Sequence, residues 1–194
     1  GVDLFDADFF GISNQEAADV DPQQRLLLER CWHALEDVRT EPRSLEGSRT
    51  GVIVGACSDE YALLRRADGR PPTPYTMTGT GRAFLANRIS HFFGFTGPSV
   101  VVDTGQSSSL VALHEALRWL RSGECSTVLV AGVQLNLSAE GDATVEALGA
   151  LSPNGRCYTF DTRANGIVRG EGAGVLVLKR LSAALADSDR VYCV

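Results

Sequence analysis

Gln106 lies where the sequence could support chemistry, and its side chain restricts what that chemistry is. Residues 97–105 read as a β-branched strand followed by a glycine turn, and residues 107–121 read as a helix that begins with serines. Such a helix start has unpaired backbone N–H groups and the positive end of the helix dipole, which favour an oxyanion. A side chain at the turn lies beside that oxyanion site. The Gln106 carboxamide donates and accepts hydrogen bonds but cannot form an acyl intermediate. The pattern therefore predicts a site that holds a thioester without attacking it.

The overall composition is typical of a globular enzyme domain. The 194 residues are 44% hydrophobic and 22% charged, enough to bury roughly 70% of the unfolded surface in a compact fold. The formal net charge of -6 argues against nucleic acid or anionic membrane as partners, because both attract basic patches. Neither an apolar run approaching the roughly 20 residues of a membrane span nor a signal peptide is apparent. We therefore expect a cytoplasmic protein.

The metal-ligating and nucleophilic residue types are scattered along the chain. The five cysteines are Cys31, Cys57, Cys125, Cys157 and Cys193. Their odd number and wide spacing predict neither a zinc site nor a dithiol redox motif, so we expect reduced thiols that pack as small buried hydrophobes, and no metal. His114 lies eight residues beyond Gln106, about 12 Å along a helix and rotated by roughly 80°, so it cannot share a substrate atom with Gln106.

Strands and helices alternate around this predicted site. Asp21 and Pro22 predict the N-cap and first position of an amphipathic helix that continues over residues 23–38. Further helices are expected over residues 81–93, 107–121 and 139–148, and strands over 51–56, 97–102, 127–133 and 174–178. Residues 68–74 contain three prolines and predict an exposed loop. Strands that are apolar on both faces and separated by helices predict one α/β unit with a mostly parallel, doubly covered sheet.

Two further signals favour structural roles over chemistry. The glycine-rich segment 170–174 precedes a strand and does not join a strand to a helix, so we interpret its glycines as close-packing or turn positions and not as a phosphate-binding loop. Asp103 stands at a strand end, where a carboxylate usually accepts hydrogen bonds from backbone N–H groups. We expect that structural role for it.

Five ordered sequence segments resemble one enzyme family. They are Phe-Phe-Gly-Ile-Ser at 9–13, Asp-Pro-Gln-Gln-Arg-Leu-Leu-Leu-Glu at 21–29, residues 101–114, Ser-Pro-Asn-Gly-Arg-Cys at 152–157 and Arg-Gly-Glu-Gly at 169–172. In these segments the whole chain, residues 1–194, resembles the N-terminal half of a ketosynthase, the beta-ketoacyl synthase domain of modular polyketide synthases. The resemblance implies the thiolase-like layered α/β fold, of which this chain is the N-terminal half only. It also implies a homodimer, with residues 98–102 near the dimer contact.

Two departures from the family pattern decide the expected function. Elongating ketosynthases carry the acylated Cys where this chain has Gln106. Gln at this position is the mark of the loading-module variant. That variant decarboxylates malonyl or methylmalonyl on an acyl carrier protein to give an acetyl or propionyl starter. Gly105, residues 134–138 and residues 191–194 also resemble that subgroup. The second departure is that the two histidines of the family's C-terminal half are absent, so these 194 residues alone are expected to be inactive.

The resemblance also implies the site residues and partners. Gln106 is the expected catalytic residue, and Gln106 with Ser107 forms the expected oxyanion site at the helix N-terminus. No cofactor is expected to bind directly, since the substrate is carried on the phosphopantetheine arm of the acyl carrier protein. An acyltransferase domain of the same synthase is the second expected partner.

Two alternatives remain open at this stage. One is a non-catalytic partner protein of the chain-length-factor type, which resembles ketosynthases and also carries Gln at this position. Such proteins usually lose the small polar run after the Gln, whereas Ser107, Ser108 and Ser109 are intact here, which favours the decarboxylase. The other alternative is an inactive fragment of a condensing enzyme.

Overall fold

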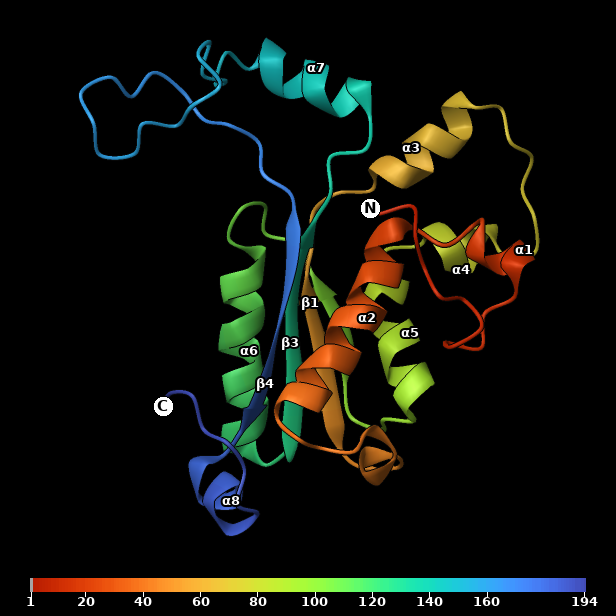
Figure 1. Cartoon of the computed structure of the whole chain (residues 1–194), viewed down its shortest axis with the longest axis vertical. Coiled ribbons are helices and arrows are strands. Elements are labelled where there is room, and N and C mark those ends of the chain that lie inside the picture. The colour runs from red at the N-terminus through yellow and green to blue at the C-terminus, as the bar shows by residue number, and fades with distance from the viewer. Residues whose placement is uncertain (1) are drawn as a thin grey trace.

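A four-stranded sheet forms the centre of the chain (Figure 1). The structure is a computed structural model and describes residues 2–194. The strands are β1 (Thr50–Gly55), β2 (Ser99–Val102), β3 (Thr127–Gln134) and β4 (Gly172–Lys179), in the spatial order β2-β1-β3-β4. Strand β1 pairs in parallel with both β2 and β3, while β4 runs antiparallel to β3. The predicted mostly parallel sheet is therefore confirmed.

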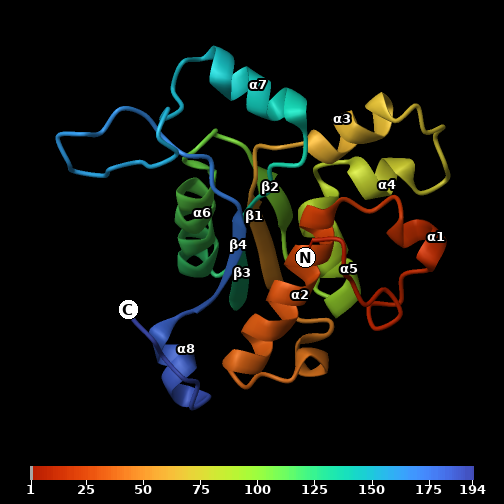
Figure 2. The same ribbon diagram turned by 45° about the horizontal axis from the view of Figure 1, so that its top comes forward.

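Helices cover both faces of this sheet. The helical elements are α1 (Asn14–Ala17), α2 (Pro22–Asp37), η1 (Pro42–Leu45), α3 (Glu60–Ala67), α4 (Thr76–Thr80), α5 (Phe84–Phe93), α6 (Ser108–Ser122), α7 (Ala139–Ala147) and α8 (Leu181–Ala186). Helices α2 and α5 pack on one face and α6 on the other (Figures 1 and 2). None of the helices among residues 2–194 has the length and apolar character needed to cross a membrane.

Local sequence signals set several of these boundaries. The Asp21 side chain accepts a hydrogen bond from the backbone N–H of Gln23 at 2.8 Å, and Pro22 occupies the first helical position of α2. Gly94 ends α5 in the left-handed region, at φ 68°. The predicted helix over 81–93 is wrong at its start, because Gly81 is extended and separates α4 from α5. Helices α1, α3, α4 and α8 and the 3-10 helix η1 were not predicted.

The sheet is not covered equally on its two faces. Every residue of β1 is buried, but β4 alternates, with Ala173, Val175 and Val177 against the core on the α2 side. On the α6 side Leu176 of β4 is 53% exposed, and Leu110 of α6 is 71% exposed. The predicted double cover is therefore correct for β1 and incomplete for β4, because Leu178 packs against the α6-side core while Leu176 stays exposed within residues 2–194.

We expect residues 1–194 alone to associate in solution, because exposed leucines on α6 and β4 leave apolar surface in water. Size exclusion should show oligomers or aggregates. Leu110→Ser combined with Leu176→Ser should shift the protein toward monomer. Met77→Ser is the control, since Met77 is 74% exposed but lies on α4, away from this surface. A monodisperse wild-type fragment would contradict the expectation.

Candidate functional site

The N-terminus of α6 lies directly against the carboxyl end of the sheet. A Cβ atom on Gly55, the last residue of β1, would lie 2.5 Å from the backbone nitrogen of Ser109. A Cβ atom on Gly132 of β3 would lie 3.0 Å from the Cβ of Ser109. Larger residues at these two glycines would push the helix away from the strands. The small residues therefore fix where α6 begins.

A tight turn joins β2 to α6 and carries Gln106. Gly105 adopts the left-handed conformation at φ 65°, which glycine adopts without steric cost. The Asp103 carboxylate accepts a hydrogen bond from the Gly105 N–H at 3.1 Å and another from Arg82. The Gly105 N–H, with Arg82, lowers the pKa of Asp103 against the raising effect of desolvation. The predicted structural role of Asp103 is confirmed.

Two serine hydroxyls brace this turn. The Ser107 Oγ donates to the Thr104 carbonyl at 2.9 Å. The Ser108 Oγ donates to the Gly105 carbonyl at 2.5 Å and accepts from the Thr104 N–H at 3.0 Å. The hydroxyl of Ser107 is thereby engaged within the chain, so any contribution of Ser107 to an oxyanion site comes from its backbone N–H.

Gln106 is exposed at the tip of the turn. Its carboxamide forms no hydrogen bond with any residue from 2 to 194, and the backbone N–H groups of Ser107 and Ser109 likewise have no acceptor within that range. A free carboxamide next to unpaired N–H groups at a helix start can donate hydrogen bonds to a bound carbonyl oxygen. The turn places Gln106 and Ser107 at the helix start, as predicted. Their catalytic role stays a prediction.

The remaining candidate residues lie apart from this turn or take no part in it. His114 is exposed on α6, two turns beyond Gln106. Among the cysteines, Cys31 and Cys125 are buried as predicted, and burial raises the pKa of Cys31 to about 12. The prediction is wrong for the other three cysteines, which are exposed: Cys57, Cys157 and Cys193.

The glycines of segment 170–174 do not pack closely. A Cβ atom at Gly170, Gly172 or Gly174 would meet no atom of the described chain within 4 Å, and none of the three has a positive φ. The close-packing or turn interpretation is therefore wrong within this chain. Segment 170–171 leads directly into β4, and it does not join a strand to a helix.

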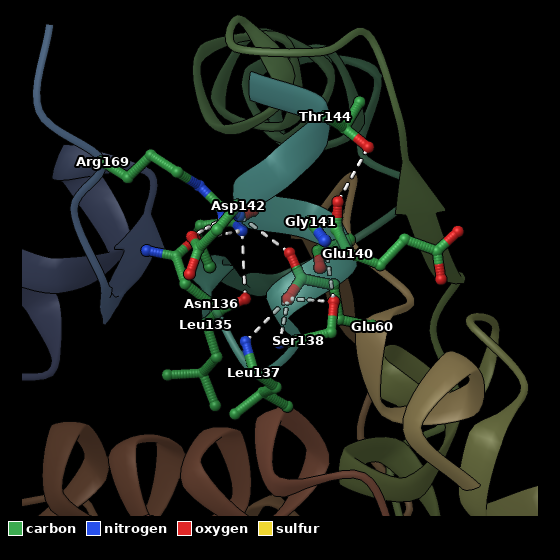
Figure 3. Close-up of polar contacts among 12 residues, drawn as sticks. Glu60, Leu135, Asn136, Leu137, Ser138, Glu140, Gly141, Asp142, Thr144 and Arg169 are labelled. Atoms are coloured by element: carbon green, nitrogen blue, oxygen red, sulfur yellow. Dashed lines mark hydrogen bonds and ion pairs between the residues drawn. The ribbon is translucent and has the colours of Figure 1, made fainter. Parts of the chain in front are cut away.

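Sequence reasoning missed a set of ion pairs at the same end of the sheet. Arg82 lies between Asp103 and Asp59, at 3.9 Å from the latter. Arg169 lies between Glu60 and Asp142 in the group shown in Figure 3, with 2.8 Å to Glu60. In the sequence, the signal for these ion pairs was the adjacent carboxylates Asp59 and Glu60, shortly after the buried strand β1.

The contact between α6 and β1 can be tested with a single methyl group. Gly55→Ala should destabilise the protein by about 1–3 kcal/mol, because the added Cβ overlaps the backbone of α6. Gly170→Ala is the control, since it adds the same methyl group to open space. Urea unfolding of both full-length variants checks the difference. Equal midpoints would show that α6 does not rest on Gly55.

The position of residue 106 can be tested by its reactivity. Gln106→Cys in the full-length protein places a thiol beside a helix N-terminus, where its pKa is expected to fall. Iodoacetamide should then label this thiol faster than Cys31 or Cys125, which are buried and have raised pKa values. The exposed Cys57 serves as a stricter control, because it shares solvent access without the helix start. If the thiol at position 106 is labelled no faster than Cys57, residue 106 does not lie beside the N-terminus of α6.

Comparison with known proteins places this geometry in a family. The beta-ketoacyl synthase, N-terminal domain family matches residues 1–184. Polyketide synthase GfsA of Streptomyces halstedii is 56% identical over 194 residues, covering 100% of this chain and 3% of that protein. A phenolphthiocerol/phthiocerol polyketide synthase of Mycobacterium tuberculosis is 50% identical over 193 residues, covering 100% of this chain and 10% of that protein.

Solved structures show the same fold. The ketosynthase from module 6 of the bacillaene synthase of Bacillus subtilis superposes with a TM-score of 0.89 at 40% identity, covering 98% of this chain and 32% of that one. The oxazolomycin ketosynthase domain OzmH KS7 of Streptomyces albus gives 0.91 at 41% identity, covering 98% and 33%. This chain thus spans about a third of these ketosynthases and a small part of the synthases above, and has the thiolase-like fold of their N-terminal half. The chain belongs to the beta-ketoacyl synthase family, as an N-terminal ketosynthase domain of the polyketide synthase type.

Proposed function

We propose that the full-length protein is the ketosynthase-like decarboxylase of a polyketide synthase loading module. Its substrate is malonyl or methylmalonyl carried on an acyl carrier protein, and its product is the acetyl or propionyl starter. The observation that carries the proposal is the Gln106 carboxamide, which is exposed and free of hydrogen bonds within residues 2–194. The family resemblance implies that this is the position of the Cys in condensing ketosynthases.

Decarboxylation requires charge stabilisation and no covalent nucleophile. The bond between the carboxylate carbon and the α-carbon breaks, CO2 departs, and the electron pair is shared between the α-carbon and the thioester oxygen as an enolate. The α-carbon then takes a proton from solvent. Hydrogen-bond donors that strengthen as charge develops on the thioester oxygen lower this barrier. A carboxamide and unpaired helix N–H groups are donors of this kind.

The shape of Gln106 supports the same role. Its carboxamide roughly matches an acylated Cys in size and polarity, so it keeps the site in the state in which condensing enzymes decarboxylate. The absence of a thiol prevents transfer of a growing chain to this position. The remaining donors in the proposal are the two histidines that the family supplies from its C-terminal half, so residues 1–194 alone should be inactive.

The serine run argues for this function over a non-catalytic partner protein. The hydroxyls of Ser107 and Ser108 hold the turn, and Ser109 fits against Gly55 and Gly132. The architecture that presents residue 106 is thus intact in this chain. In the proposal the partners are an acyl carrier protein, an acyltransferase domain of the same synthase and a second copy of the ketosynthase.

The proposal is tested by CO2 release in the full-length protein. Gln106→Ala should slow release from malonyl-carrier protein by about 100-fold or more, because one oxyanion donor is lost. Gln15→Ala is the control, since Gln15 is an exposed glutamine on α1 and lies outside the turn. An unchanged rate in Gln106→Ala would remove Gln106 from the mechanism. A wild-type protein that binds carrier protein and releases no CO2 would favour the non-catalytic partner.

A further inference from the structure

Helix α7 has no fully buried residue to hold it in place. It follows β3 and lies beyond the carboxyl end of the sheet (Figures 1 and 2). None of its nine residues, Ala139–Ala147, is buried. A helix without a buried face gains little from the hydrophobic effect, so its position depends on polar contacts at its ends.

Those contacts converge on Glu60, at the start of α3. Glu60 is 7% exposed. Its Oε2 accepts hydrogen bonds from the backbone N–H groups of Leu137 and Ser138, both at 2.7 Å, and from the Ser138 hydroxyl at 3.0 Å (Figure 3). Ser138 is the N-cap of α7 and itself accepts from the Gly141 N–H at 3.0 Å. One carboxylate therefore holds the whole entry to the helix.

Arg169 completes the attachment from another part of the chain. It lies just before β4, and its Nη2 donates to Glu60 Oε1 at 2.8 Å while Nη1 donates to Asp142 in the first turn of α7. Burial alone raises the pKa of Glu60, but the hydrogen bonds from Arg169, Ser138 and Leu137 outweigh burial and lower the pKa. Glu60 is thus ionised at neutral pH, and its charge is matched by the guanidinium.

The fit between Glu60 and α7 is close. A Cβ atom at Gly141 would lie 2.4 Å from Glu60 Oε1. The carboxylate thus lies directly on the backbone of the first turn of α7. A side chain at position 141 would displace the Glu60 carboxylate from this position.

The Glu60 contacts lie at the same sheet edge as Gln106. Strands β1, β2 and β3 are parallel, so the segments that follow them meet at their carboxyl ends, where α/β proteins bind ligands. Asp59, next to Glu60, faces Arg82, and Arg82 also binds Asp103 in the turn before Gln106. Asp59 is thus linked to the Gln106 turn through Arg82, and Glu60 is linked to α7 through Arg169.

We infer that Glu60 is a positioning residue, which with Arg169 holds α7 and the segment after β3 at the sheet edge that also carries Gln106, and thereby sets how tightly the acyl thioester is bound. The inference rests on the proposed function for the identity of that thioester. Glu60 itself touches no substrate in this role. Its loss releases α7 and weakens substrate binding, while the chemistry at Gln106 remains.

The experiment uses the full-length protein and two variants, Glu60→Gln and Arg169→Gln. Hydrogen exchange at residues 137–147 should become at least about tenfold faster in both variants, while exchange in β1 and β3 stays unchanged, because the opening is local. KM for malonyl-carrier protein should rise about fivefold or more, with kcat within about twofold, because only binding is weakened. Arg169→Gln is the safer variant to fold, since its side chain is less buried than that of Glu60.

The control is Glu115→Gln, which removes the carboxylate of the Glu115–Arg118 ion pair on the surface of α6. It should change neither hydrogen exchange in α7 nor KM. The double variant Glu60→Gln with Arg169→Gln should weaken binding by less than the product of the two single effects, because the residues act together.

Three results would overturn the inference: unchanged exchange in α7, faster exchange spread equally over the sheet, or an unchanged KM when α7 is released. If the wild-type protein releases no CO2, the proposed function fails. The inference about Glu60 is then tested by hydrogen exchange in α7 and by the affinity for malonyl-carrier protein, which replaces KM.

Discussion

The close contact between α6 and the end of the sheet is the constraint on which the site depends. Gly55 and Gly132 let the first turn of α6 approach β1 and β3 so closely that no side chain fits between them. The turn before the helix then lies at the sheet edge, where the N–H groups of Ser107 and Ser109 have no acceptor within residues 2–194. In the proposed function, the oxyanion site depends on this backbone placement, and the side chain at position 106 adds a further donor.

Charge pairs hold the other segments at this edge. Arg82 and Arg169 each join two carboxylates that lie far apart in the sequence. Arg82 binds Asp59, and Arg169 binds the adjacent Glu60. The apolar core lies away from this edge, between the sheet and helices α2, α5 and α6. The division is useful for an enzyme, because the core supplies most of the stability while the polar edge fixes geometry.

The sequence predicted the parts of the fold that local chemistry determines. The Asp21 cap, the Gly94 stop and the buried strand β1 are each specified by residues next to one another. Helix α3 was missed because its buried residues are Glu60 and Arg65, which are compensated by Arg169 and Asp19, far away in the sequence. The spacing of apolar residues cannot predict ion pairs between residues that are far apart in the sequence.

The same limit explains the errors in the site and the sheet. The sequence located the turn that carries Gln106, because a strand, a glycine and a serine run mark it. It did not show that the Ser107 hydroxyl bonds within the turn, since that depends on the dihedral angles there. The strand β4 was expected to be covered on both faces, but Leu176 remains exposed, because an apolar residue does not reveal whether its cover lies in the same segment of chain.

The isolation of the Gln106 side chain has an evolutionary consequence. Within residues 2–194 nothing hydrogen-bonds to its carboxamide, and the glycine, serines and carboxylate that shape the turn do so without it. As far as residues 2–194 are concerned, selection can therefore exchange the residue at position 106 without compensating mutations. A nucleophile and a hydrogen-bond-donating amide are then alternative side chains for one position on the same backbone.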